Sequence, residues 1–489
     1  MPDDDERPSG RRLNGRLARR LMAGAGAAVL LVVAAVVFVL VHAPHNVSHP
    51  NLSFTAPTTS TTTTAAPPPP DHFLWPRYGY DLARTRAFTG APDLHPPFRR
   101  GWTVGQNALL EFPPVIDGHT LWYMDDNATV KAVDTITGRV RWQRRIGRLA
   151  AASPVLDPAK GLLIVPTLSD TGSSPGSGQV IALSMRTGAT IWHHFLPSGS
   201  ESSGLIAGGS VYFGDQAGTV YSMNAATGHV NWTFQASGAV KGGAALSGEN
   251  LYVDDYGGHV YDINARTGHQ IWAASANGAA LGFSSGTFYT TPAVAFGRVY
   301  VGNTSGYVYS FTANTGQLAW SYGTGAYVYS SPAVADIPGL GPTVYLGSYN
   351  GDFYAFNARS GAVRWVHRDA YGDRISGSPT IVNDVVYYSD LDDKLTTGLN
   401  ARSGKVVFTF HDGAFSPVVA DPTHLYLVGG YTLYQLLPAS TRRTSRPPAA
   451  PPRSRTGHSA PRQSRSGPSV VRRSRPVSRK ARTGRGRSH

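Results

Sequence analysis

Acidic side chains form the clearest chemical pattern in this sequence. Three adjacent pairs, Asp125-Asp126, Asp254-Asp255 and Asp392-Asp393, are of a type that could bind a metal ion or act as acid and base. When the internal repeats of the chain are aligned, a short polar residue recurs at one equivalent position: Asp125, Asp215, Asp255, Asn303, Ser348 and Asp390. Such residues start turns by hydrogen bonding to their own backbone. The pattern therefore predicts a recurring turn, with no metal ligand and no catalytic carboxylate.

A second motif with chemical meaning is Gly282-Phe283-Ser284-Ser285-Gly286, which fits the Gly-x-Ser-x-Gly pattern of hydrolases. That motif needs a sharp strand-to-helix turn and a supporting His–acid pair. Here it lies in a loop rich in Gly, Ala and Ser, and no helical pattern follows it. We therefore predict no nucleophile at Ser284 and no catalytic residue in the chain.

The elements that position these residues are set by a repeat. Seven variations of Asx-Ala-x-(Thr/Ser)-Gly are each followed, after three residues, by a large aromatic: Trp142, Trp192, Trp232, Trp272, Trp320, Trp365 and Phe408. A period of 40 to 50 residues is the signature of a β-propeller with one four-stranded blade per repeat. In each copy the tryptophan offers a flat apolar face to the neighbouring blade and an indole N–H that can reach a carbonyl.

The number of blades follows from the two ends of the repeat region. The last strand set, residues 416–419, 425–428 and 433–436, contains three strands and no outer strand. Residues 100–104 read as an outer strand with nothing before it, and pairing the two ends would cover an open edge. We predict an all-β, eight-bladed β-propeller closed in this way, with seven blades as the alternative.

The repeats resemble the PQQ-like β-propeller family. The match is carried by residues 331–334, 344–347, 351–357 and 360–365, and residues 75–85 resemble the segment that leads into such propellers. The resemblance covers about residues 73–437. It implies one of two functions, because some members are quinoprotein dehydrogenases and others are non-enzymatic scaffolds.

The dehydrogenases of this family hold PQQ on the propeller axis with Ca²⁺, a catalytic Asp and commonly a ring of adjacent cysteines. This chain has no cysteine, and its blades lack long insertions. We therefore expect no cofactor and a non-catalytic platform for a protein or cell-envelope partner, as in the eight-bladed periplasmic scaffold of outer-membrane assembly. A PQQ-dependent enzyme oxidising an alcohol or sugar is the alternative, and a sugar or wall-polymer sensor is a third interpretation.

The remaining segments differ from the propeller in composition. We predict a cytoplasmic basic segment over 1–20, a transmembrane anchor over 21–42, a Thr/Pro-rich stalk over 43–72, the propeller over 73–438 and a disordered Arg-rich tail over 439–489. A cleaved signal peptide is the alternative to the anchor. This topology places a monomeric propeller outside the cytoplasm on the cell membrane.

Basic charge is concentrated in the tail. The chain carries +14 overall, while 14 Arg and Lys480 give the tail +15 with no acidic residue after Arg442. Because the tail follows an exported domain, we expect it to meet an anionic envelope surface and not nucleic acid.

A ligand site is expected where the links between blades and the second hairpins meet, on one face of the ring. The longest links are residues 274–290, 322–330 and 368–376. Their aromatic and charged side chains suit recognition of peptides or sugars. The predicted site residues are Phe283, Phe288, Tyr289, Tyr327, Tyr329, Tyr371, Asp373 and Arg374.

Overall fold

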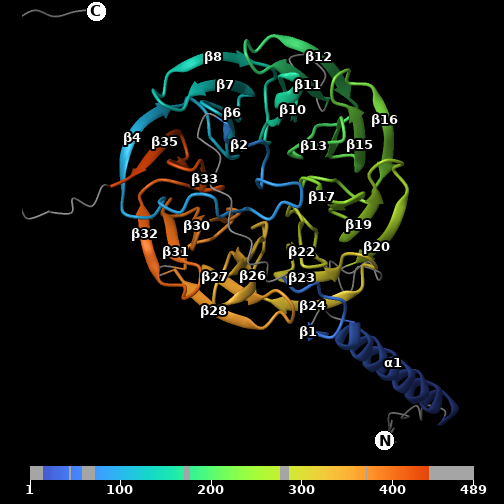
Figure 1. Ribbon diagram of the computed structural model, residues 1–489. Helices are drawn as coiled ribbons and strands as arrows, with labels where there is room; N and C mark the ends of the chain where they lie inside the picture. The colour runs from blue at the N-terminus through green and yellow to red at the C-terminus, as the bar shows by residue number, and fades with distance from the viewer. Residues whose placement is uncertain are drawn as a thin grey trace, which may run out of the picture. The chain divides into compact units, whose positions relative to one another are not determined.

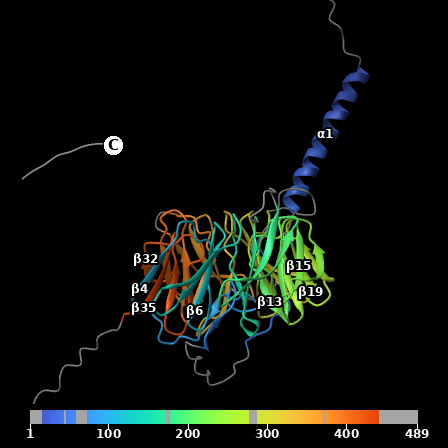
Figure 2. The same cartoon turned by 90° about the horizontal axis from the view of Figure 1, so that it is seen from above.

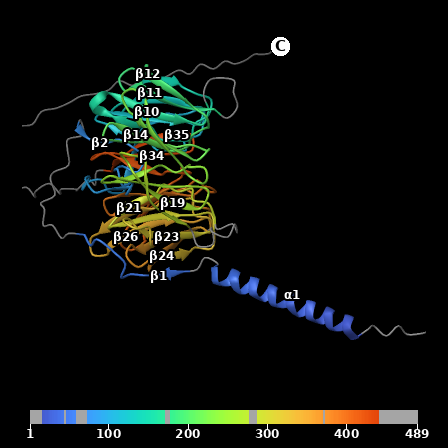
Figure 3. The same ribbon diagram turned by 90° about the vertical axis from the view of Figure 1, so that its right-hand side faces the viewer.

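A computed structural model describes residues 15–42, 46–57, 72–169, 177–275, 286–369 and 372–439. Eight antiparallel sheets form a ring around a central axis, which Figure 1 views end-on and Figures 2 and 3 from the side. The predicted all-β, eight-bladed propeller is therefore confirmed.

Each of the first four blades runs from a three-residue inner strand to an exposed outer strand. Blade 1 contains β5 (Val115–Asp117), β6 (Thr120–Asp125), β7 (Thr129–Asp134) and β8 (Val140–Arg145). Blade 2 contains β9 (Val155–Asp157), β10 (Leu162–Thr167), β11 (Gly178–Ser184) and β12 (Thr190–Leu196). Blade 3 contains β13 (Leu205–Ala207), β14 (Ser210–Gly214), β15 (Thr219–Asn224) and β16 (Val230–Gln235). Blade 4 contains β17 (Ala245–Ser247), β18 (Asn250–Asp254), β19 (His259–Asn264) and β20 (Gln270–Ser275).

The other four blades repeat this order. Blade 5 contains β21 (Ala293–Ala295), β22 (Arg298–Gly302), β23 (Tyr307–Thr312) and β24 (Leu318–Gly323). Blade 6 contains β25 (Ala333–Ile337), β26 (Gly341–Gly347), β27 (Asp352–Asn357) and β28 (Val363–Arg368). Blade 7 contains β29 (Thr380–Val382), β30 (Val385–Ser389), β31 (Thr396–Asn400) and β32 (Val406–Phe410). Blade 8 contains β33 (Val418–Ala420), β34 (Leu425–Val428), β35 (Thr432–Pro438) and β4 (Phe98–Gly105).

The ring closes through blade 8, whose outer strand comes from the beginning of the propeller. β4 pairs antiparallel with β35, with Val104 opposite Leu433 and Phe98 opposite Pro438. The pairing satisfies the backbone edge of β35 and joins the two ends of the repeat region. The predicted closure through residues 100–104 is confirmed.

Neighbouring blades are held together by the repeated tryptophans. The indole N–H groups of Trp142, Trp192, Trp232, Trp272, Trp320 and Trp365 donate at 2.9–3.2 Å to carbonyls of Met185, Ala225, Ala265, Ala313, Ala358 and Ala401 in the next blade. Trp102 of β4 makes the same contact with the Thr135 carbonyl at 2.8 Å. Phe408 has no N–H and packs edge-on against Phe98 of β4, with ring centroids 5.5 Å apart. The predicted role of the aromatic position is confirmed.

The segment between β2 (Leu74–Trp75) and β3 (Ala87–Phe88) runs inside the ring (Figure 1). Backbone N–H groups of the inner strands of blades 2, 4, 5, 6 and 7 donate to its carbonyls. The donors are Leu156, Leu246, Val294, Val334 and Ile381, and the acceptors are Pro76, Leu82, Ala83, Thr85 and Arg86, at 2.7–2.9 Å. β2 adds to blade 1 beside β5, and β3 pairs parallel with β29. The segment thereby crosses the central channel.

Two further short elements complete the description. A 3₁₀ turn, η2 (Pro158–Lys160), joins β9 to β10. β1 (Val47–Ser48) pairs with β24, and Arg298 donates through Nη2 to the Leu52 carbonyl at 2.7 Å. Part of the predicted stalk, residues 46–57, therefore lies against blade 5.

The N-terminal helix α1 spans Gly15–His42, and its side chains are described from Gly24 to Phe38, where all are exposed. Within the described part of the chain, none of the helices has the length and apolar character needed to cross a membrane. The predicted transmembrane anchor over residues 21–42 is therefore not confirmed. The Arg-rich tail after Ala439 lies outside the described residues.

Candidate functional site: an axial pocket

A cavity of about 360 Å³ lies at the axis, where the links between blades meet. One repeat position supplies much of its wall: the residue four places before the first residue of an inner strand. At this position stand Glu111, Glu201, Lys241, Tyr289, Tyr329 and Ser376, all of which line the cavity. Because the blades repeat around the axis, side chains from this one repeat position lie next to one another around the cavity.

The charged part of the wall is an ion pair between adjacent blades. Lys241 Nζ lies 2.9 Å from Glu201 Oε1, and both side chains are largely shielded from solvent. Glu201 also accepts hydrogen bonds from Tyr289 Oη at 3.1 Å and from Gln216 Nε2 at 2.6 Å. The positive charge of Lys241 is thus already matched, and Glu201 is fixed in place.

The second carboxylate of the wall, Glu111, has no hydrogen-bond or ion-pair partner among the described residues. Burial, together with the charges of Asp126 and Glu201, raises the pKa of Glu111 to about 7. Because no basic group offsets this rise in pKa, the electrostatic potential at the Glu111 carboxyl is negative. An arriving cation would favour its ionised form.

Aromatic rings form the part of the wall beside the Lys241 ion pair. Tyr256 and Tyr349 come from the second hairpins of blades 4 and 6, and Tyr289 and Tyr329 from the links before blades 5 and 6. Tyr289 packs edge-on against both Tyr256 and Tyr329, at centroid distances of 5.7 and 5.2 Å. Lys241 Nζ lies 4.9 Å from the Tyr256 ring centroid. It also lies 5.6 Å from the Tyr289 ring centroid, so Lys241 already uses both of these rings. The face of Tyr329 can receive a further cation, because an aromatic ring carries negative potential on its face.

The floor of the cavity is the segment that crosses the channel. Tyr78 lines the cavity and donates its hydroxyl to Ser378 Oγ at 2.7 Å. Behind it Arg84 is fully buried, and donates to the carbonyls of Tyr78, Ala244, Ser203 and Gly204. The guanidinium is therefore used to tie the segment to blades 3 and 4, which closes this end of the channel.

The predicted site residues lie in different surroundings. Tyr289 and Tyr329 line the cavity as expected. Tyr327 is 52% exposed and contacts Tyr329 and Tyr349 at the rim, where Arg374 also lies, 5.9 Å from the Tyr349 ring. Phe288 is fully buried against Tyr309, and Asp373 belongs to a separate acidic cluster. Phe283 and Tyr371 lie outside the described residues, as does Ser284.

Sequence reasoning missed Glu111, Glu201 and Lys241, although a signal for them exists. They occupy the same repeat position as Tyr289 and Tyr329, in shorter links. The ligand site was predicted only in the longest links between blades, and these three residues do not lie there. Aligning the residue four places before each inner strand would have found all five.

Five of the six repeated turn residues accept a hydrogen bond from the backbone of their hairpin, as predicted. Ser348 is the exception, because its hydroxyl donates to the carbonyls of Ala326 and Tyr327. Oδ1 of Asp215 accepts from Thr219 N at 2.8 Å, and Oδ1 of Asp255 accepts from His259 N at 2.8 Å. Asp125 and Asn303 make the same contact with Thr129 and Tyr307. These side chains close the second hairpins and do not enter the cavity wall.

The cavity wall does not fit PQQ. PQQ carries three carboxylates, which need basic partners when they are removed from water. Of the lining residues only Lys241 is basic, and it is paired with Glu201, while Glu111 adds a second negative charge. Arg84 lies beneath the floor and is bound to backbone carbonyls. A trianionic quinone would therefore meet repulsion at this wall.

These features define an eight-bladed propeller with an axial pocket of aromatic and acidic residues. Its ring is closed by the pairing of β4 with β35. The chain belongs to the PQQ-like propeller family whose model is described as outer membrane protein assembly factor BamB, with matches over residues 176–410 and 323–471. A search of curated proteins finds no match.

Solved structures share the fold at low sequence identity. BamB from Moraxella catarrhalis is 19% identical, with a TM-score of 0.55, covering 70% of this chain and 98% of that one. Quinohemoprotein alcohol dehydrogenase from Comamonas testosteroni is 13% identical, with a TM-score of 0.58, covering 74% and 80%. A europium-containing methanol dehydrogenase is 13% identical, with a TM-score of 0.62, covering 76% and 99%. At these identities the likeness concerns the fold alone.

Proposed function

We propose that this chain is a non-catalytic binding propeller whose axial pocket receives a basic side chain of a protein partner. The observation that carries the proposal is Glu111, a shielded carboxylate that faces the cavity without a basic partner among the described residues. The family description, an assembly factor for outer membrane proteins, supports a role that involves other proteins.

The chemistry of the wall favours an ammonium or guanidinium group over other ligands. Glu111 supplies the counter-charge, and the face of Tyr329 can supply a cation–π contact worth about 0.5–2 kcal/mol. The rings of Tyr256 and Tyr289 already face Lys241. A cavity of about 360 Å³ has room for a lysine or arginine side chain with part of its backbone. A sugar would gain the ring stacking but would leave the charge of Glu111 unmatched.

Short peptides that differ only in one central residue provide the test. The full chain is titrated by calorimetry with peptides that carry lysine, arginine, acetyl-lysine or norleucine at that residue. We expect the lysine or arginine peptide to bind at least tenfold more tightly than acetyl-lysine, and Glu111→Gln to remove this preference. Glu249→Gln, in an exposed turn between β17 and β18 outside the cavity wall, is the matched control. Equal binding of lysine and acetyl-lysine peptides would refute the proposal.

The pH dependence of binding gives an independent check. Glu111 is ionised above its pKa of about 7 and mostly neutral below it. The affinity for a basic peptide should therefore rise as the pH increases through about 7 and then level off. In Glu111→Gln this rise should disappear, because the group that titrates has been removed.

A PQQ-dependent dehydrogenase is the competing function, since two of the structural neighbours are alcohol or methanol dehydrogenases. Thermal unfolding in PQQ plus Ca²⁺, compared with Ca²⁺ alone, distinguishes the two. At a hundred times its Kd a ligand adds about 2.7 kcal/mol of stability, which is readily measured. We expect no stabilisation beyond that of Ca²⁺ alone.

For the location of the protein, we propose that the propeller lies outside the cytoplasm and that the basic tail contacts an anionic envelope surface. The support is the arginine-rich start of the sequence before its apolar stretch, and the +15 charge from Arg442 onward. Protease accessibility in intact cells tests the location. Sedimentation with anionic vesicles, with and without residues 439–489, tests the tail.

A further inference from the structure

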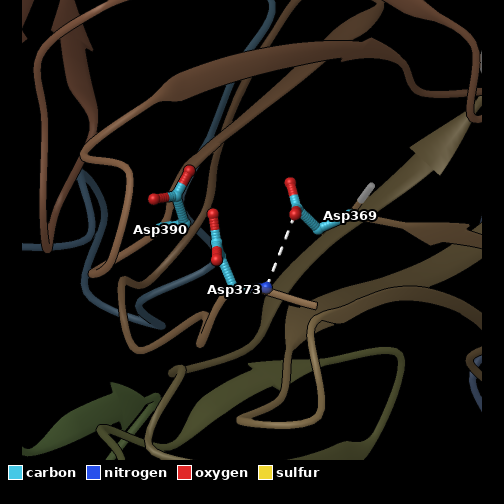
Figure 4. Close-up of side chains that lie close together, drawn as sticks. All are labelled: Asp369, Asp373 and Asp390. Atoms are coloured by element: carbon cyan, nitrogen blue, oxygen red, sulfur yellow. Dashed lines mark hydrogen bonds between the residues drawn. The ribbon is translucent and has the colours of Figure 1, made fainter. Parts of the chain in front are cut away.

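Three carboxylates converge in a cluster outside the axial pocket. Asp369 and Asp373 lie in the link between β28 and β29, and Asp390 lies directly after β30 in the second hairpin of blade 7 (Figure 4). One carboxylate oxygen from each residue can be chosen so that all three lie within 4.8 Å of one another. None of the three lines the axial cavity.

Asp390 differs from its equivalents in other blades. In blade 3, Asp215 accepts from backbone N–H groups through Oδ1 and from the Tyr221 hydroxyl, at 3.0 Å, through Oδ2. In blade 4, Asp255 is satisfied in the same way, with Tyr261 as the hydroxyl donor at 3.0 Å. Both carboxylate oxygens of these residues therefore have protein partners.

In blade 7 that tyrosine is missing. The hairpin is one residue longer, and the residue paired with Tyr388, at the position of Tyr221 and Tyr261, is Thr397. Asp390 is only 1% exposed; its Oδ2 accepts from Leu395 N at 3.2 Å, but its Oδ1 is buried without a hydrogen-bond partner. Oδ2 of Asp373 is also buried without one. Two shielded carboxylate oxygens thus lack the donors that such atoms need.

The neighbouring arginines do not neutralise the cluster. Arg368 is paired with Asp352, through contacts of 2.8 and 3.1 Å. Arg374 is paired with Asp392, whose Oδ2 also accepts from the Arg374 backbone N–H at 2.9 Å. Burial raises the pKa of Asp390 to about 6, and the charges of Asp373 and Asp369 contribute to the rise. The carboxylates therefore repel one another, and neither of these two arginines pairs with them.

We propose that Asp369, Asp373 and Asp390 bind a calcium ion that joins the link before blade 7 to the second hairpin of that blade. Carboxylate oxygens without nitrogen or sulfur ligands select a hard cation such as Ca²⁺ or Mg²⁺. Three carboxylates from an irregular loop and a hairpin suit Ca²⁺, which accepts flexible geometry, better than Mg²⁺, which requires a near-ideal octahedron and usually keeps several waters. Water can complete the shell, because Asp369 and Asp373 are partly exposed.

The test is calorimetric titration of the full chain, after treatment with a chelator, with CaCl₂ and separately with MgCl₂. We expect one saturable Ca²⁺ site, weakened at least tenfold by Asp373→Asn and by Asp369→Asn. Asp390 is left intact in these variants because its Oδ2 closes the hairpin. The matched control is Asp336→Asn, an exposed aspartate at the β25–β26 turn of blade 6 that is outside the cluster. Its Ca²⁺ affinity should equal that of the wild type.

Several results would overturn the proposal. One is the absence of saturable Ca²⁺ binding up to roughly 10 mM, well above the range of weak extracellular calcium sites. Another is Ca²⁺ binding that both cluster variants retain unchanged, which would place the ion elsewhere in the chain. Tighter binding of Mg²⁺ than of Ca²⁺ would refute the assignment of the metal. Circular dichroism shows whether each variant keeps its fold, and two separate variants guard against a local folding defect.

Discussion

Replacing Gly268 with alanine should separate backbone strain from the contact that joins two blades. Gly268 has a φ of +77°, in the left-handed region, and lies under the ring of Trp232 from the preceding blade. A Cβ added there would lie 2.8 Å from Cδ2 and 2.9 Å from Cε3 of that ring. The ring would have to move away, because neither atom belongs to a flexible end of a side chain.

The expected loss of stability has two parts. Left-handed backbone costs an alanine about 1–2 kcal/mol relative to glycine. Displacing Trp232 adds about 1–3 kcal/mol of overpacking and about 1 kcal/mol for its hydrogen bond to the Ala265 carbonyl, now 3.0 Å long. The free energy of unfolding should therefore fall by about 3–6 kcal/mol.

Gly248 of the same blade provides the matched control. Its φ is +63°, and an added Cβ would meet no atom within 4 Å. Gly248→Ala should cost only the backbone part, about 1–2 kcal/mol. The assay is urea unfolding followed by circular dichroism, comparing midpoints at equal slope. In a Trp232→Ala background the extra cost of Gly268→Ala should disappear. Equal losses for Gly268→Ala and Gly248→Ala would refute the account of how the blades join.

Three further predictions concern the pocket wall, the channel segment and the closing blade. Because the folded pKa of Glu111 is about 7 against an ordinary value of 4.5, this group costs stability as the pH rises between these values. Glu111→Gln should thus raise the melting temperature at about pH 8 but not at about pH 4, and a pH-independent effect would contradict this. Arg84→Met should lower the free energy of unfolding by about 3 kcal/mol or more in urea, since buried carbonyls lose a charged donor, whereas the exposed Arg266→Met should stay within about 0.5 kcal/mol. Trp102→Phe should cost about 1 kcal/mol in the same assay, because the Thr135 carbonyl keeps its second donor, Gln435, at 2.8 Å; a loss above about 3 kcal/mol would show that closure depends on more than this hydrogen bond.

The ring was predictable because each repeat contains both halves of the contact with its neighbours. A tryptophan such as Trp232 and the glycine beneath it, Gly268, recur at fixed offsets, so the contact between blades is visible in the sequence. The closing strand was predictable for a related reason. Residues 100–104 have the pattern of an outer strand, but the other three strands of a blade do not precede them in the sequence. The pattern of one repeat therefore determined the fold.

The pocket was predictable only in part. Tyr289 and Tyr329 were found because they lie in long links, while Glu111 and Glu201 lie in short ones and were missed. Phe288 was assigned to the site but is fully buried against Tyr309, because an isolated bridge to Asn303 holds it at the edge of its blade. Link length is a weaker guide than position relative to the inner strand, which decides the distance from the axis.

The sequence by itself determined the eight blades, the docking of each blade on the next and the closure of the ring. The contacts between blades join residues in adjacent repeats, so periodicity encodes them. Closure joins the two ends of the repeat region, and the sequence indicates it because one end lacks the outer strand that the other end supplies. The tertiary structure alone decided which residues meet at the axis and which do not find partners. Tyr78 reaches Ser378 across 300 residues, and Oδ1 of Asp390 is buried without the hydroxyl that its equivalents receive. Such contacts depend on where ring closure brings distant loops, and no local pattern specifies that geometry.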